Sequence, residues 1–234
     1  MLLSALLGAA TPLDNARRAQ ALLGPEVWSR VIEIDNAAGG ARYPALVHAL
    51  VFEFAGILWF YADADGTQSF SLHRGQLAAE KADFAPLLRE IDPGFLRWRA
   101  LADDGAPAPG TAAAAEPLLN GCFVESVAAW RRRVARGEET GAPRLLSYYF
   151  KPGVAKAGHT VLAFEARGRL EIFDPARPER RFEFSRRAGS DALRLARELD
   201  GRAVARARFL ELPEAPPAAV ADAPAAAGRA GATL

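Results

Sequence analysis

The sequence predicts an α+β fold in which an antiparallel sheet packs against a helix that carries the chain's single cysteine, Cys122, near its N-terminus, with a small α+β subdomain before it. Two observations predict this fold. Runs of β-branched and aromatic residues, separated by short turns, recur in both halves of the chain, and amphipathic helical patterns flank them. Half of the 234 residues are apolar, which is enough to bury a sizeable core.

The first third of the chain predicts a helix followed by a small antiparallel sheet. Thr11 is a candidate N-cap, Pro12 suits the first helical turn, and Gly24 ends the pattern. Ala55 and Gly56 separate two apolar runs of β-forming residues and predict a tight hairpin. The expected elements are a helix over 15–24, strands over 27–34, 43–54, 57–61 and 67–72, and a helix over 75–91, to which Pro86 is an objection.

Composition indicates where the chain divides. Residues 102–117 combine Gly, Pro and small residues with almost nothing to bury, which is typical of a linker or a long surface loop. From residue 213 onward the chain lacks side chains large enough to offset the entropy of ordering, which indicates a disordered tail. We therefore expect a subdomain over 1–101, a linker over 102–117, a second domain over 118–212 and a tail over 213–234.

The second domain is expected to open with an amphipathic helix after Cys122. An apolar stripe steps along it by four, three and four residues, Gly137 is a candidate C′ residue, and the arginines at 131–133 are expected on its solvated side. The stripe consists of Phe123, Val127, Trp130 and Val134. The expected elements that follow are a strand over 144–150, two strands within 159–174, a strand over 180–185, a capped helix over 190–201 and a closing strand over 203–212.

The charge balance disfavours a nucleic-acid or anionic membrane partner, because 29 Lys and Arg residues face 28 Asp and Glu residues. The preference for Arg over Lys indicates a GC-rich coding bias of bacterial type. One cysteine cannot form an intramolecular disulfide, no Cys/His cluster has the spacing of a zinc site, and no cofactor motif is present. The apolar N-terminal run is too short to span a bilayer and lacks the basic start of a signal peptide. We expect a cytoplasmic protein with no metal or cofactor, and the oligomeric state stays open.

The sequence leaves two possible roles for Cys122, a reactive thiol and an inert core thiol. If Asn120 is the N-cap and Gly121 the first helical residue, Cys122 lies in the first turn, where the helix dipole favours a thiolate and free backbone N–H groups can bind an oxyanion. Gly121 would then let a substrate approach closely. The alternative is an inert core thiol, since free cysteine is among the most buried residue types.

His159 and Asp174 form a second candidate pair. His159 opens an expected strand and Asp174 closes the next one, so the two residues lie at the same end of a hairpin. A carboxylate there can fix the tautomer of the imidazole and leave the other ring nitrogen to face a thiol. The alternative is a surface histidine beside an Asp-Pro turn.

Residues 118–175, about a quarter of the chain, resemble the papain-like cysteine protease superfamily in its transglutaminase-like and C39-type branches. "NGC" opening a helix, then "GHTVLAF" followed by "LEIFDP", carry the resemblance. It implies an α+β fold with the cysteine helix against an antiparallel sheet and thiol chemistry on an amide or thioester. Residue by residue, it implies a Cys-His-Asp triad with Cys122 as nucleophile, His159 as base and Asp174 as its orienting partner.

The chain also departs from that family. Papain-like peptidases often place a glutamine about six residues before the cysteine, where this chain has Glu116. The oxyanion donor is then expected from the Cys122 backbone, from Asn120, or from Gln68 or Gln76. Sequence alone therefore predicts a thiol enzyme, a peptidase, amidase or acyl transferase, that acts on a peptide or isopeptide bond of a protein or peptide. The alternative is an inactive papain-like scaffold that serves as a protein-binding or assembly module.

Overall fold

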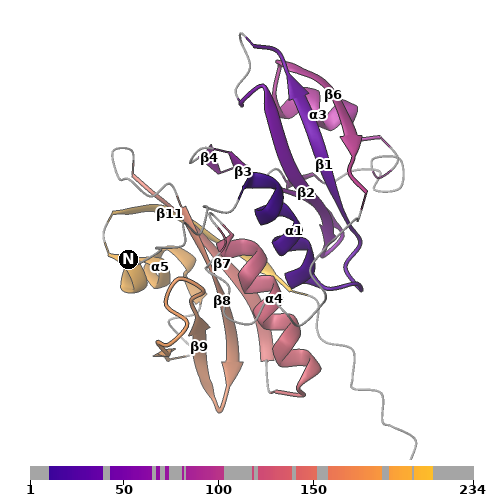
Figure 1. Ribbon diagram of the computed structural model, residues 1–234. Helices are drawn as coiled ribbons and strands as arrows, with labels where there is room; N and C mark the ends of the chain where they lie inside the picture. Colours follow the sequence, from indigo (N-terminus) through magenta and orange to yellow (C-terminus); the bar gives the residue numbers. More distant parts are fainter. Residues whose placement is uncertain are drawn as a thin grey trace, which may run out of the picture.

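The computed structural model has an α+β architecture built from two antiparallel sheets and flanking helices (Figure 1). It describes residues 11–38, 43–64, 67–68, 72–73, 81, 83–102, 118, 121–138, 141–151, 158–185, 190–201 and 203–212. The coarse α+β prediction is therefore confirmed. The expected tail and nearly all of the expected linker lie outside the described residues.

The N-terminal sheet has the strand order β4-β3-β2-β1-β6, and β5 also pairs with β3. Its strands are β1 (Ser29–Asn36), β2 (Leu46–Phe54), β3 (Ile57–Ala64), β4 (Thr67–Gln68), β5 (Leu72–His73) and β6 (Phe95–Ala100). The β2–β3 hairpin turns at Ala55 and Gly56, both with positive φ, as the sequence predicts. Strand β6, which the sequence patterns did not predict, pairs with β1 at the sheet edge.

Helix α1 (Pro12–Leu23) has the predicted N-terminus. The Thr11 hydroxyl accepts a hydrogen bond from the Asp14 N–H, and the Asp14 carboxylate accepts one from the Thr11 N–H, which together form a capping box. Pro12 occupies the first turn, where its missing N–H costs nothing, and Gly24 ends the helix at a φ of 79°. The cap residues alone thus account for both ends of this helix.

The helix expected over 75–91 is not continuous in the structure. Residues 83 and 84 are not helical, and α3 (Ala85–Ile91) begins immediately before Pro86. Proline has no N–H to donate and restricts the residue before it, so it starts this helix rather than continuing an earlier one. Residues 74–80 and 82 lie outside the described residues.

The C-terminal sheet has the strand order β10-β9-β8-β7-β11. Its strands are β7 (Gly141–Phe150), β8 (Gly158–Ala166), β9 (Arg169–Phe173), β10 (Phe182–Phe184) and β11 (Val204–Glu211). Helix α5 (Ala192–Asp200) is capped by Asp191 and packs against β7 and β11. Helix α4 (Cys122–Ala135) packs against β7 and β8, so the predicted contact of a cysteine-bearing helix with an antiparallel sheet is present.

Helix α4 buries the start of its predicted stripe and ends as predicted. Phe123, Val127 and Trp130 are buried, and Val134 is half-buried against the same core. Gly137 has a φ of 65°, its N–H donates to Val134, and the next N–H donates to Arg133, which is a Schellman C-cap.

The prediction that the arginines at 131–133 lie on the solvated side of α4 is wrong in part. Arg132 is exposed, but Arg131 donates to the Leu23 carbonyl and to Glu26, which ties α4 to the end of α1. Arg133 lies 4.5 Å from the centre of the Phe164 ring. Guanidinium groups on long stems can cover apolar surface and reach a neighbouring carbonyl, which a helical repeat cannot reveal.

One hydrophobic core joins the two halves of the chain. Helices α1 and α4 lie side by side between the N-terminal sheet and the C-terminal sheet (Figure 1). Buried side chains from β1, β2, β3, β7 and β8 meet those of both helices in this core. Two smaller clusters fill the outer faces, beneath α3 on the N-terminal sheet and beneath α5 on the C-terminal sheet.

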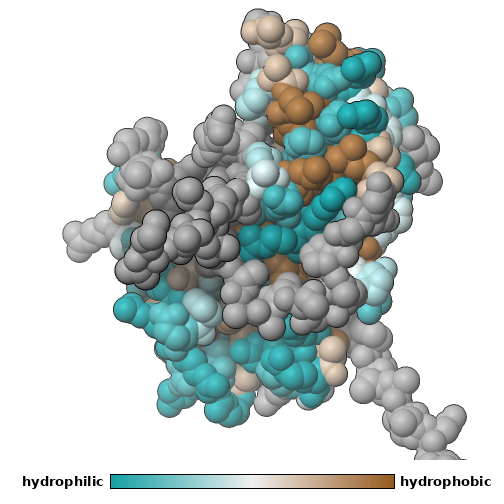
Figure 2. Space-filling view, viewed as in Figure 1, coloured by the Kyte–Doolittle hydropathy of each residue, from teal (hydrophilic) through white to brown (hydrophobic). Residues whose placement is uncertain are grey.

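The face of the molecule shown in Figure 2 differs between the two sheets. On the face shown in Figure 2, apolar residues lie among polar ones over the N-terminal sheet, whereas polar residues dominate the coloured part of the C-terminal half. Leu96 on β6 is 61 % exposed. In the part of the chain that the structure describes, no helix has the length and apolar character needed to cross a membrane.

Candidate functional site: a cysteine, histidine and aspartate at one end of the sheet

Three chain segments bring together Cys122, His159 and Asp174, since His159 is bonded to Asp174 and interacts with Cys122. Cys122 is the first residue of α4, His159 is the second residue of β8, and Asp174 directly follows β9. Because β8 and β9 are antiparallel, the start of one and the end of the other are adjacent. The hairpin therefore places the imidazole and the carboxylate together, as the sequence spacing suggested.

His159 and Asp174 are joined by a buried hydrogen bond. Nε2 of His159 lies 2.7 Å from Oδ1 of Asp174, and the two residues are 4 % and 0 % exposed. The carboxylate also accepts hydrogen bonds from the Ala176 N–H at 2.9 Å and from Nε of Arg177 at 2.6 Å. Burial alone would raise the pKa of Asp174, but these hydrogen bonds and the charge of His159 lower it to about 2. Asp174 is therefore an ionised, fully satisfied carboxylate.

The other neighbour of His159 is Cys122, which is half-buried. Burial alone would lower the pKa of His159, but the hydrogen bond to Asp174, the interaction with the Cys122 side chain and the charge of Asp174 raise it to about 9. Since Asp174 occupies Nε2, Nδ1 is the ring nitrogen left for the thiol. The raised pKa favours the imidazolium form of His159, which is bonded to the Asp174 carboxylate.

A network of polar side chains extends behind Asp174. Arg177 bridges Asp174 and Asp200, with its guanidinium 2.6 Å from the first carboxylate and 3.0 Å from the second. The Tyr148 hydroxyl donates to Asp200 at 2.6 Å, and burial followed by that carboxylate raises the pKa of the phenol well above its usual range. The Tyr148 ring packs edge-on against the His159 ring, with 5.6 Å between centroids and 87° between planes.

Sequence reasoning missed these three supporting residues. Arg177 follows Asp174 by three positions, so the "DPAR" turn was a local signal that could have indicated it. Tyr148 lies opposite His159 only in the β7–β8 register. Asp200 is the last residue of α5, and its place beside Tyr148 depends on how that helix packs on the sheet.

The start of α4 differs from the expectation by one residue. Gly121, not Asn120, is the N-cap, and it makes no side-chain cap, so Cys122 is the first helical residue. Asn120 and Gln76 lie outside the described residues, as does the side chain of Gln68, so these oxyanion candidates stay predictions. The N–H of Cys122 has no acceptor within the helix, because the first turn has no preceding carbonyl to bond.

Gly121 has a packing role, and the expected role of leaving room for a substrate stays a prediction. A Cβ at this position would lie 2.1 Å from Cβ of Leu118, which is buried. The Gly121 N–H donates to the Leu118 carbonyl, and the Leu118 N–H donates to the Glu125 carboxylate at 2.8 Å. Burial raises the pKa of Glu125, while the charges of nearby Arg18 and His159 oppose that rise. Glu125 thus fixes the turn that leads into Cys122.

No group of three or more His, Cys, Asp or Glu side chains among the described residues is arranged to hold a metal ion. Comparison of the chain with protein families, with curated proteins and with solved structures gave no match.

Proposed function

We propose that this protein is a cysteine-dependent hydrolase or acyl transferase that acts on peptide or isopeptide bonds through a papain-like site. Cys122 is the nucleophile, His159 carries the proton, and Asp174 holds the imidazole. The observation that supports this most directly is the position of His159, which is bonded at 2.7 Å to a buried carboxylate and whose raised pKa has the side chain of the only cysteine among its causes. Nucleophile, base and orienting group in this order form the arrangement of activated-nucleophile enzymes.

The proposed chemistry starts from a protonated His159, because its pKa is raised. The sulfur of Cys122, with His159 as imidazolium, attacks the carbonyl carbon, and the amide oxygen becomes an oxyanion near the first turn of α4. The C–N bond then breaks, and Nδ1 of His159 gives its proton to the leaving amine, which leaves a thioester. Water or an acceptor amine attacks the thioester, His159 accepts its proton, and the thiolate leaves with the product released.

Selective alkylation of the thiol tests the proposal without a known substrate. Cys122 is the only cysteine, so thiol alkylation by iodoacetamide reports on it alone. We expect the alkylation rate at pH 7 to fall by about tenfold or more in His159→Ala, because the thiolate is the reactive form. The matched control is His48→Ala, since His48 is a half-buried histidine whose Nε2 lies 3.5 Å from Glu33 on the other sheet.

Acyl transfer to the protein provides the second measurement. With p-nitrophenyl acetate, we expect a burst of p-nitrophenolate equal to the enzyme concentration and an acetyl group on Cys122 in the intact mass. A wild-type alkylation rate equal to that of His159→Ala, with no acetyl burst, would contradict the proposal. That result would favour the inactive binding or assembly module.

A further inference from the structure

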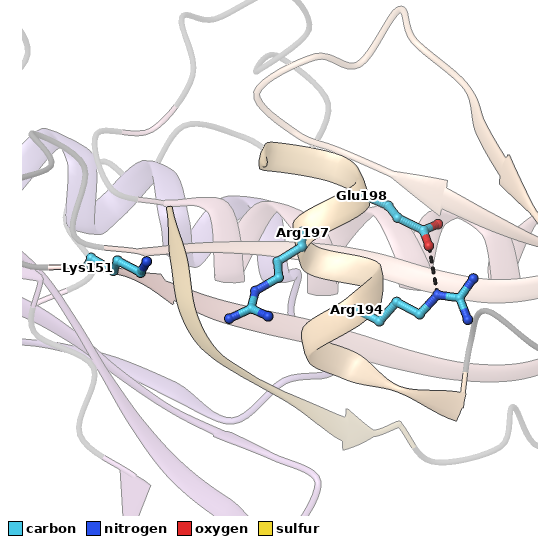
Figure 3. Close-up of a pocket in the computed structure, with 4 residues that line it drawn as sticks. All are labelled: Lys151, Arg194, Arg197 and Glu198. Atoms are coloured by element: carbon cyan, nitrogen blue, oxygen red, sulfur yellow. Dashed lines mark hydrogen bonds and ion pairs between the residues drawn. The ribbon is translucent and has the colours of Figure 1, made fainter. Parts of the chain in front are cut away.

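A pocket lies at the junction of α5, the end of β7 and the start of β11. It has a volume of about 500 Å³ and is lined by Lys151, Arg194, Arg197 and Glu198 (Figure 3). Lys151 directly follows β7, and the other three residues lie on α5. None of these side chains interacts with Cys122, His159 or Asp174 in the structure. The proposed thiol chemistry therefore does not use this pocket.

The charges in the pocket do not cancel. Glu198 accepts from Nε of Arg194 at 2.9 Å, an i,i+4 pair that neutralises both groups. No ion pair to Lys151 or Arg197 is present among the described residues. In Figure 3, the Arg197 side chain leaves α5 on the side of Lys151, while Arg194 and Glu198 pair with each other on the opposite side. Two uncompensated positive charges therefore line one part of the pocket.

The backbone fixes both cationic residues to the same short segment. The Lys151 N–H donates to the Ala203 carbonyl at 2.9 Å, and Nε of Arg197 donates to the carbonyl of the next residue, Val204, at 3.3 Å. This leaves the two terminal nitrogens of the Arg197 guanidinium and the Lys151 ammonium for a ligand. A guanidinium fork matches two oxygens of one phosphate or carboxylate group, and an ammonium adds a point charge.

We propose that this pocket binds a small organic anion through a phosphate or carboxylate group held by Lys151 and Arg197. The volume falls in the range of small-molecule sites, so the pocket has room for an organic body beside the charged group of the ligand. The proposal does not depend on the reactivity of Cys122, and measurements of anion binding alone test it.

Calorimetric titration of the full chain with phenyl phosphate and with benzoate tests it, because these probes share a ring and differ in the charged group. We expect at least one probe to bind, and Lys151→Met to raise its Kd by about tenfold or more, since a charge-assisted contact is lost. Lys151→Arg keeps the charge and should retain binding. The control is Arg169→Met, which removes one positive charge outside the lining of this pocket and should leave the Kd within about twofold.

The two probes distinguish the two chemistries: binding of phenyl phosphate alone assigns a phosphate site, and binding of benzoate alone assigns a carboxylate site. The Lys151 variants carry the test, because Arg197 also bonds the Val204 carbonyl and its replacement can disturb β11. Heats no larger than those of sodium chloride at matched ionic strength, or an unchanged Kd in Lys151→Met, would overturn the proposal.

Discussion

Arg177 and Asp174 form an ion pair at 2.6 Å in which the carboxylate is completely buried and is also bonded to His159. The same carboxylate thus serves two cations, one from the turn after β9 and one from β8. Arg177 in turn reaches Asp200, so the imidazole is connected through two carboxylates to the end of α5. The position of His159 therefore depends on residues well outside its own strand.

Replacing Arg177 with Met should destabilise the protein by about 3 kcal/mol, because Asp174 and Asp200 would keep their charges in partly dry surroundings with one fewer partner. Urea unfolding at pH 7 measures this loss. Arg169→Met is the matched control, since Arg169 pairs with Glu183 at the exposed surface and its loss should leave the unfolding midpoint unchanged within error. Equal midpoints for both variants would contradict the structural role of Arg177.

Stability should depend on pH through the same pair. The folded-state pKa of His159 is raised to about 9 from 6.5, so its contribution is fully present below pH 6.5 and is lost as the pH rises through about 9. The folded-state pKa of Asp174 is lowered to about 2 from 3.8, so its contribution is present above pH 3.8 and is lost as the pH falls through about 2.

Urea unfolding of the wild type and of His159→Gln between pH 5 and pH 10 isolates the contribution of His159 to the free energy of unfolding. The stability difference between the two proteins should shrink by roughly 3 kcal/mol between pH 6.5 and pH 9.5, since one pKa unit corresponds to about 1.4 kcal/mol. A difference that stays constant across this range would show that the pKa of His159 is the same in the folded and unfolded states.

The elements with strong local signals were predictable from sequence. The capping box of α1 needs only Thr11, Pro12 and Asp14, and the β2–β3 turn needs only Ala55 and Gly56. Each depends on residues within one turn of chain, where backbone geometry and side-chain chemistry act without tertiary contacts. The same locality explains why the sequence correctly predicted that His159 and Asp174 lie at the same end of the β8–β9 hairpin.

The elements and residues that the sequence did not predict are positioned by packing. Strand β6 was missed because it is an edge strand with only Phe95 buried, so its sequence does not alternate clearly between apolar and polar residues. Tyr148 and Asp200 were missed because only strand register and helix docking bring them together. The one-residue error at the start of α4 has a similar cause, since Gly121 is placed by its contact with Leu118 rather than by a capping side chain.

That contact gives a direct prediction for Gly121→Ala. The new methyl group would overlap Leu118, so the turn must shift, at a cost of about 1–3 kcal/mol typical of an overpacked site. Because this turn leads into Cys122, the iodoacetamide rate should change as well. Gly141→Ala is the control: its Cβ would meet Glu165 only at 3.4 Å or more, and its φ is not positive. A Gly121→Ala protein as stable as Gly141→Ala would contradict the close packing at the start of α4.

The two ends of Tyr148 should have separable effects. Tyr148→Phe removes the hydroxyl that donates to Asp200 but keeps the ring against His159, so stability should fall by about 1–2 kcal/mol while the alkylation rate of Cys122 stays within about twofold. Tyr148→Leu also removes the edge-on ring contact, which should let the imidazole move and lower the alkylation rate further. Urea unfolding and iodoacetamide kinetics on both variants measure the two effects. If Tyr148→Phe loses as much reactivity as Tyr148→Leu, then the hydroxyl and Asp200, rather than the ring, hold His159 beside the thiol.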